Sequence, residues 1–381
     1  MNLRTHCSLL FFSILFVSVS ILASATKDQS TANNAPQLLW KATPNPCALT
    51  EPVVGGESVF VGTCEGKFYA IANDRGSVFW SHDSRAEGAS GGFQATPLLR
   101  KDLVIAGTFD GCNATTGGYV FGFDQHTGKL RWKLQAGIGS VAFVEIDDAN
   151  VFFGTPQGEW LSVEPNSGKV NWRFRATPPG TNCEKRISAV TDGMHVCLMA
   201  YDGTVHCLDA KSGRELWKQN PSSPLTTRVF MYKDVLYFGT ADGHIYGFNP
   251  ENGQPLVQLK LDYVPVGDFV WSHEGAKGEF EFVYATDKNK DSGAVLGFSD
   301  EFEAVIWDRT FIAHGTSEHP APWKGRLFAA DCKGDIVAYS ASTGVPEWKG
   351  HVEGCVKAFN HSRSTLYVAV AEGAIYTFKF Q

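Results

Sequence analysis

The chain has 381 residues, of which 43% are hydrophobic, and carries a formal net charge of −7 from 33 basic and 40 acidic side chains. This mildly acidic balance disfavours nucleic acid or an anionic membrane surface as the main partner. The length is sufficient for two ordinary domains or one large one.

The first 25 residues have the pattern of a secretion signal. Arg4 precedes the apolar run LLFFSILFVSVSIL at residues 9–22, and a small-x-small sequence ends at Ala25. This run is shorter than the ~20 apolar residues that span a bilayer. Cys7 precedes the run, so it cannot be the lipid-bearing cysteine of a lipoprotein signal. We therefore expect cleavage after Ala25, a secreted or periplasmic protein with no membrane span, and a flexible segment at 26–35. An uncleaved anchor is the alternative.

From residue 36 onward, the sequence repeats. A tryptophan recurs at intervals of about 40 to 52 residues, with Val257 in its place in one unit, usually four residues after a glycine, as in GSVFW and GKLRW. This period suits a four-stranded antiparallel unit. Indoles at one register predict that each unit presents the same large apolar group to its neighbour, so we interpret them as packing residues. They are Trp40, Trp80, Trp132, Trp172, Trp217, Trp307 and Trp348.

Each unit also contains two strand-like segments around a turn that ends in glycine, as in VFVGTCEGKFYAI and LYFGTADGHIYGF. Glycine adopts the positive φ angles of such hairpins without steric cost. Eight copies of the hairpin predict an all-β, eight-bladed β-propeller of four-stranded antiparallel blades over residues 36–381. PQLLWKAT at 36–43 looks like a fourth strand without a unit, whereas the last unit has three strands. We expect these two parts to pair and close a monomeric ring, which covers their edges.

Eight cysteines follow the leader, and an even number in an exported chain favours disulfides. The candidate pairs are Cys47 with Cys64, Cys197 with Cys207, Cys332 with Cys355 and, by elimination, Cys112 with Cys183. The first two pairs lie symmetrically about a turn, and the third would lie on successive blades near the same face. Spacing alone does not fix the connectivity, and partly buried free thiols are the alternative.

No catalytic residue and no metal site are predicted. In HGTSEH, His314 and His319 could bind a transition metal, but this spacing has no fixed geometry on a loop. The one G-x-S-x-G match, around Ser90, lacks the following helix that exposes a nucleophile. Asn113 and Asn360 lie in glycosylation sequons, which matter only in a eukaryotic host.

The stretches TPLLRKDLVIAGTFDG and VLYFGTADGHIYGFNPENG resemble the pyrroloquinoline-quinone (PQQ) repeat, a propeller module with a tryptophan docking motif. This family includes periplasmic quinoprotein dehydrogenases and non-enzymatic propellers similar to BamB. The resemblance implies the fold and leaves both functions open. The chain lacks the adjacent cysteines of many such dehydrogenases, and no Glu/Asn/Asp calcium-ligand set can be matched. It also lacks the lipid-bearing cysteine of BamB.

Long loops should gather on one face of the ring, because strand direction alternates within each blade. The lengthened hairpin turns at 111–118 and 287–293 and several inter-blade connectors belong there. The candidate contacts on this face are Trp271, His314, His319 and Trp323. Burial of the two tryptophans, which fall outside the repeating register, is the favoured alternative. We expect an exported, non-catalytic scaffold that binds an unknown protein or extracellular ligand and needs no cofactor. The alternative is a PQQ- and calcium-dependent dehydrogenase of small alcohols or sugars.

Overall fold

The computed structural model describes residues 36–380 apart from several internal segments. These segments are 46, 48–49, 110–117, 138–142, 147–149, 156–157, 179–186, 274–278, 287–292, 299–304 and 312–319. The predicted leader and its cleavage site therefore lie outside the described residues.

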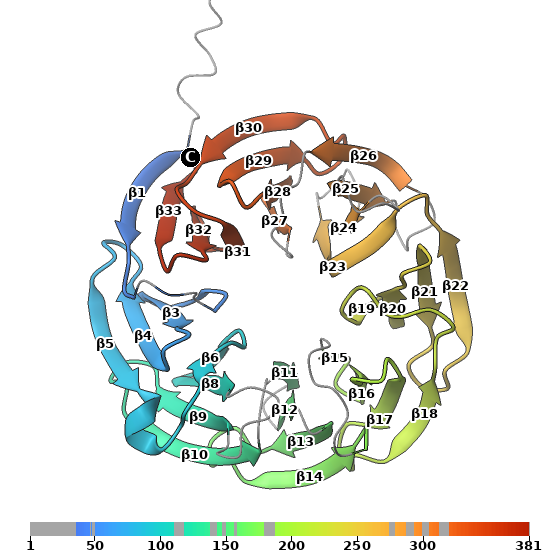
Figure 1. Cartoon of the computed structure of the whole chain (residues 1–381), viewed down its shortest axis with the longest axis horizontal. Helices are drawn as coiled ribbons and strands as arrows, with labels where there is room; N and C mark the ends of the chain where they lie inside the picture. The colour runs from blue at the N-terminus through green and yellow to red at the C-terminus, as the bar shows by residue number, and fades with distance from the viewer. Residues whose placement is uncertain are drawn as a thin grey trace, which may run out of the picture. The chain divides into compact units, whose positions relative to one another are not determined.

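The described strands form eight sheets around a centre, which we name blades A to H in the order of their first inner strand (Figure 1). Blade A contains β2 (Val53–Gly55), β3 (Ser58–Gly62), β4 (Lys67–Ala72) and β5 (Val78–Asp83), followed by the short 3-10 helix η1 (Ser84–Glu87). Blade B contains β6 (Gly92–Phe93), β7 (Leu98–Arg100), β8 (Leu103–Phe109), β9 (Gly118–Asp124) and β10 (Leu130–Gly137). Blade C contains β11 (Phe143–Ile146), β12 (Asn150–Gly154), β13 (Glu159–Val163) and β14 (Val170–Arg175). Blade D contains β15 (Ser188–Thr191), β16 (His195–Met199), β17 (Val205–Asp209) and β18 (Glu215–Gln219).

The remaining blades follow the same order from the centre outward. Blade E contains β19 (Phe230–Tyr232), β20 (Val235–Gly239), β21 (His244–Phe248) and β22 (Pro255–Lys260). Blade F contains β23 (Val264–His273), β24 (Glu279–Thr286), β25 (Gly293–Phe298) and β26 (Val305–Phe311). Blade G contains β27 (Ala321–Trp323), β28 (Arg326–Ala330), β29 (Asp335–Ser340) and β30 (Pro346–His351). Blade H contains β31 (Val356–His361), β32 (Thr365–Val370), β33 (Ile375–Lys379) and β1 (Gln37–Ala42).

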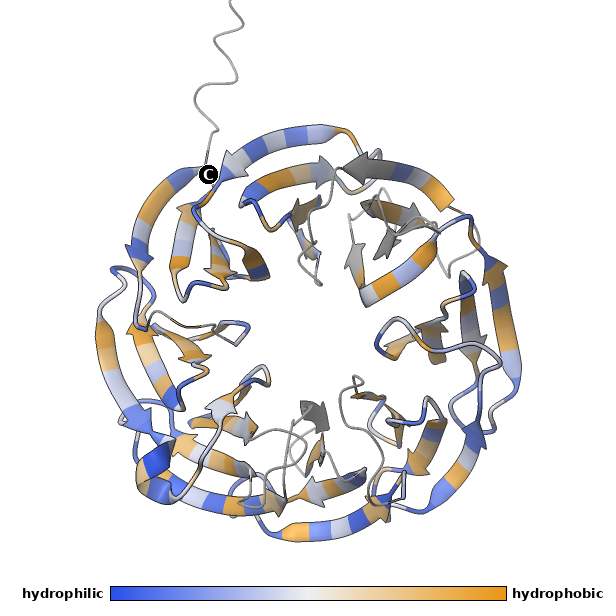
Figure 2. Cartoon of the chain, in the orientation of Figure 1, coloured by the Kyte–Doolittle hydropathy of each residue, from blue (hydrophilic) through white to orange (hydrophobic). Residues whose placement is uncertain are grey.

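This arrangement confirms the predicted all-β propeller of antiparallel blades. Seven of the described sheets have four strands, as expected. Blade B departs from the prediction because β6 and β7 both pair with β8, which gives a five-stranded sheet. Figure 2 shows apolar residues in the strands of every blade, with polar residues alternating along outer strands such as β14. The core therefore lies between successive blades, where apolar faces pack together.

The N-terminal strand completes the last blade, as predicted. β1 pairs antiparallel with β33, with Gln37 opposite Lys379 and Ala42 opposite Ile375. The hydroxyl of Thr377 accepts a hydrogen bond from the amide of Trp40 at 3.2 Å and donates one to the Trp40 carbonyl at 3.1 Å. Trp40 also joins an apolar cluster formed with blade A, so blade H packs against its neighbour across the closure.

The outer strand of each blade has the same local irregularity. The residue before the recurring tryptophan, or before Val257 in blade E, has no partner in the ladder, which is a β-bulge. The residue opposite each of these positions is small, which leaves room for an indole over the neighbouring strand. These residues are Ala70, Gly122, Ser162, Cys207, Gly247, Gly297, Ala338 and Thr377.

Each tryptophan of the repeating register except Trp348 packs on a glycine of the next blade, in the turn between its third and outer strands. In the first joint, Trp40 contacts Gly76, and in the second, Trp80 contacts Gly128. The indole N–H also donates to a backbone carbonyl of that turn at 2.7 to 3.0 Å in six joints. A Cβ at Gly128 would lie 2.5 Å from the Trp80 ring, so only glycine fits. The tryptophans are packing residues, in line with the prediction.

Candidate functional site

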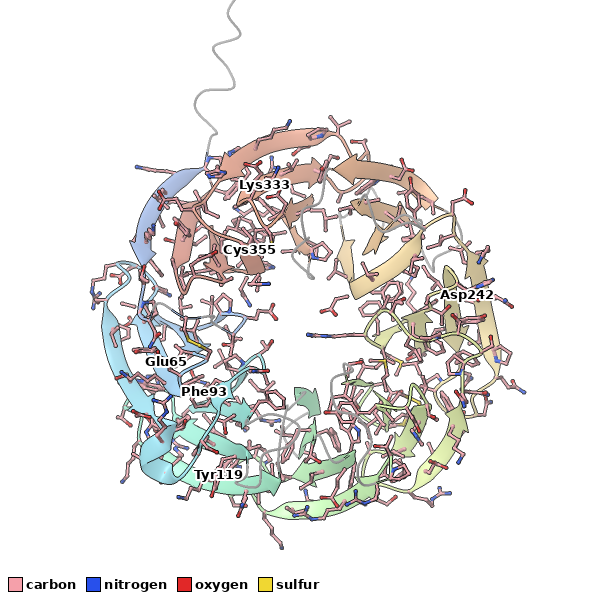
Figure 3. All side chains as sticks on the ribbon, viewed as in Figure 1. Glu65, Phe93, Tyr119, Asp242, Lys333 and Cys355 are labelled. Carbon is pink, nitrogen blue, oxygen red and sulfur yellow. A yellow bond between two sulfur atoms is a disulfide. The ribbon has the colours of Figure 1, made fainter. Side chains whose placement is uncertain are left out.

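The turns between the second and third strands of the blades lie on the same face as the connectors that join one blade to the next. We call this the loop face. In four blades, the connector N–H donates to the carbonyl of the glycine that ends the hairpin turn, as from Ser84 to Gly66 at 2.9 Å and from Val352 to Gly334 at 2.9 Å. These glycines have positive φ angles, which a residue with a side chain rarely adopts. Figure 3 shows Glu65, Asp242 and Lys333 on three of these turns.

Two disulfides tie connectors to hairpin turns on the loop face. Cys47 pairs with Cys64, and Cys332 pairs with Cys355. A third disulfide, between Cys197 and Cys207, crosses two neighbouring strands inside blade D. These are three of the pairs that the sequence favours. The fourth candidate pair, Cys112 with Cys183, lies outside the described residues.

One pocket on the loop face lies in blade D. It has a volume of about 510 Å3 and lies between the hairpin turn 200–203 and the connector from blade D to blade E. In blades A, C, E, G and H, the connector closes tightly over the hairpin glycine, but at Gly203 the nearest atom to an added Cβ would be the Leu225 side chain at 3.9 Å. The connector has the sequence NPSSPLTT, and its Pro224 carbonyl accepts a hydrogen bond at 2.8 Å from Ala241 N–H in the hairpin turn of blade E.

The wall of this pocket is mixed in polarity. Its lining residues are Met199, Ala200, Asp202, Gly203, Asn220, Pro221, Ser222, Ser223, Pro224, Leu225, Thr226 and Thr227. The buried hydroxyl of Thr226 has no hydrogen-bond partner within the described part of the chain, which normally costs free energy. Asp202 is the one charged lining residue. The pocket therefore suits a neutral or basic group that combines apolar surface with a hydrogen-bonding atom.

A smaller cavity, of about 230 Å3, lies among inner-strand residues of blades F, G and H. Asp268, Asn360 and His361 contribute to its lining, together with Glu51. Asp268 follows Gly267 in a bulge of β23 and forms an ion pair with Arg228 at 3.2 Å. Burial is the main cause that lowers the pKa of His361 below its ordinary value. The carboxylate of Glu51 accepts a hydrogen bond from Thr96 at 3.0 Å.

The predicted contact residues have different outcomes. Trp323, for which the sequence left exposure and burial open, is buried: its side chain is 7% exposed and packs against Phe328, His361 and Phe380. The backbone of Trp271 lies in β23 opposite Glu281. His314 and His319 lie outside the described residues. Sequence reasoning missed the pocket because NPSSPLTT is no longer than other connectors, some of which also contain two or more prolines.

Among the residues that the structure describes, no three His, Cys, Asp or Glu side chains form a group that could hold a metal ion. Also within the described residues, no helix has the length and apolar character needed to cross a membrane.

The ring, its tryptophan–glycine joints and its loop face define a β-propeller with a tryptophan docking motif. A family model described as "Outer membrane protein assembly factor BamB" matches residues 29–196 and 160–282. These ranges cover more than half of the sequence, so the chain belongs to this family.

Curated relatives fall into two groups. The outer membrane protein assembly factor BamB of Nitrosomonas eutropha is 26% identical over 181 residues, which is 45% of this chain and 41% of that protein. The dehydrogenase subunit of the quinone alcohol dehydrogenase of Gluconobacter oxydans is 23% identical over 441 residues, which is 84% of this chain and 58% of that protein. The chain thus spans about half the length of the curated relatives it matches.

Solved structures show the same fold. The crystal structure of BamB from Moraxella catarrhalis has a TM-score of 0.70 at 16% identity and covers 91% of this chain and 100% of that chain. The quinohemoprotein alcohol dehydrogenase of Comamonas testosteroni has a TM-score of 0.66 at 14% identity and covers 93% of this chain and 78% of that chain.

Proposed function

We propose that this protein is an exported, non-catalytic scaffold whose eight-bladed ring binds a partner protein through the loop face. The blade D pocket carries this proposal, because it joins apolar surface to polar side chains such as Asp202 and Ser223 at the foot of an exposed connector. The relatives named as outer membrane protein assembly factors support a role in protein binding. The disulfides support export, because they persist in oxidising compartments.

A pair of tryptophan substitutions in blade D tests this proposal. Ser222→Trp fills the mouth of the pocket, whereas Lys211→Trp places the same side chain on the turn at the opposite end of the blade. Each variant would be used as bait for co-purification from the native organism, with thermal unfolding measured in parallel. We expect Ser222→Trp to lose a partner that wild type and Lys211→Trp retain. Equal recovery of every partner by both variants would contradict the proposal.

The match to the Gluconobacter quinone alcohol dehydrogenase supports a second candidate, a PQQ- and calcium-dependent dehydrogenase of small alcohols or sugars. Adding PQQ, Ca²⁺ and a redox dye to the protein separates the two candidates. Reduction of the dye with an alcohol or a sugar would favour the dehydrogenase, whereas no reduction would favour the scaffold.

A further inference from the structure

Blade H is built differently from the other described blades. Its third strand, β33, and its outer strand, β1, come from distant parts of the chain, so no turn joins them. Trp348 of blade G consequently has no turn glycine on which to pack. Its ring instead lies 6.0 Å from that of Phe378 and 5.6 Å from that of Phe380. The joint between blades G and H therefore lacks the tryptophan–glycine contact that the other tryptophans make.

The connector that enters blade H is held on both sides. The Cys332–Cys355 disulfide joins it to the hairpin turn of blade G. The backbone of the same cysteine bonds the hairpin turn of blade H, because the Cys355 carbonyl accepts from Ala371 N–H at 2.8 Å. The Cys355 N–H also donates to the Glu372 carboxylate at 3.0 Å.

The connector that leaves β1 is held in a corresponding way. The Cys47–Cys64 disulfide joins it to the hairpin turn of blade A, and the Asn45 amide donates to the Glu65 carboxylate at 2.8 Å. The connector also lies directly on the hairpin turn of blade H, since a Cβ added to Gly373 would collide with the Asn45 carbonyl. Each of the two connectors that flank blade H thus carries one disulfide to a neighbouring blade.

The three disulfides differ in their access to solvent. Cys64 is exposed, and Cys47, Cys332 and Cys355 are half-buried. Cys197 and Cys207 are both 0% exposed. Thiol–disulfide exchange requires that a thiolate reach one of the sulfur atoms, so a reductant should attack the two flanking disulfides before the one in blade D.

We propose that the Cys47–Cys64 and Cys332–Cys355 disulfides form a redox-sensitive latch that keeps blade H closed. A dithiol reductant delivers two electrons and two protons to each disulfide, giving two thiols, and itself becomes a cyclic disulfide. Once the latch is reduced, β1 and the connector that follows it are held by the ladder with β33, by the Trp40 contacts, by the Lys41–Glu353 ion pair and by the Asn45–Glu65 hydrogen bond. The strand then separates from blade H more often, and the ring opens at this joint.

Hydrogen exchange of the segment 36–43 tests the latch. The key variant replaces Cys47, Cys64, Cys332 and Cys355 with serine, and the matched control replaces Cys197 and Cys207. We expect exchange of 36–43 to be at least ~10-fold faster in the key variant than in wild type, because each disulfide restrains the open state. The control should exchange at the wild-type rate in this segment. An unchanged rate in the key variant, or equal acceleration in the control, would overturn the proposal.

Wild-type protein provides a second measurement that does not depend on folding of a variant. Brief treatment with dithiothreitol, followed by alkylation and peptide mass analysis, reports which cysteines are reduced in the folded protein. We expect labelling of the four latch cysteines before Cys197 and Cys207, with faster exchange of 36–43 in the same sample. Reduction of the latch without faster exchange would overturn the proposal as well.

Discussion

The indole N–H of Trp40 donates a hydrogen bond to the backbone carbonyl of Asn73 at 3.0 Å, although the two residues lie in different blades. The same ring packs on Gly76. Trp40 therefore connects the strand that closes the ring to the blade that begins it.

Replacing Trp40 should weaken the whole ring. We expect Trp40→Ala to lower the free energy of unfolding by about 3–5 kcal/mol, because a large buried ring is lost. Trp40→Phe should cost less, since it keeps apolar surface and loses mainly the hydrogen bond, at about 1 kcal/mol. Denaturant unfolding followed by far-UV circular dichroism measures both. Equal losses for the two variants would show that ring packing contributes little at this joint.

Alanine substitutions at two turn glycines distinguish the cost of backbone strain from the cost of a steric clash. Gly128 has φ +68°, and a Cβ added to it would lie 2.5 Å from the Trp80 ring. Gly56 has a similar φ of +58°, but a Cβ added there would meet no atom within 4 Å. We expect Gly56→Ala to cost about 1 kcal/mol from strain alone. Gly128→Ala should cost about 1–3 kcal/mol more, because the indole must move. Thermal unfolding of the two variants gives the comparison, and a smaller loss for Gly128→Ala would be the contrary result.

Stability should fall in mild acid. His82 is half-buried against Phe121 and Phe123, and this burial is the main cause that lowers its pKa in the folded protein. The unfolded chain therefore binds a proton at His82 more readily than the folded protein does. The stability that the neutral His82 side chain contributes is fully present above the ordinary pKa of about 6.5 and is lost as the pH falls through the lowered pKa of the folded protein. His82→Phe should reduce the decrease in denaturation midpoint between pH 7.5 and pH 5.5. A decrease as large as that of wild type would argue against His82 as a cause.

Removing residues 36–43 should abolish cooperative unfolding. Without β1, the edge of β33 is exposed and the apolar cluster between blades H and A loses Trp40. We expect a broad transition at lower temperature by scanning calorimetry. Adding a synthetic peptide of residues 36–43 should restore part of the lost stability, because binding to the folded state stabilises it. A truncated protein with the wild-type transition would refute this role of β1.

Much of the fold is predictable because its determinants are local. The glycine turns, the tryptophan spacing and the orphan strand at 36–43 each identify a part of a blade, and the closure follows from them. The five-stranded blade B was not predicted, because β6 consists of two residues and has no strand-like pattern. The candidate site was less accessible to sequence reasoning. Trp323 lies outside the tryptophan register, and only tertiary packing decides between the exposure and the burial that the sequence left open. The pocket of blade D depends on the path of the connector 220–227, which no local pattern fixes.

The bulges along the outer strands affect how copies of the molecule meet in solution. Regular edge strands invite a second molecule to extend the sheet, and fibres can result. Here each outer strand contains one β-bulge. Several of the bulged residues are exposed and apolar, such as Phe79 and Leu256. If a second molecule approached an outer strand, its backbone N–H and C=O groups would not align with those of the bulged strand. The propeller should thus stay monomeric at high concentration, even though its outer strands expose apolar side chains.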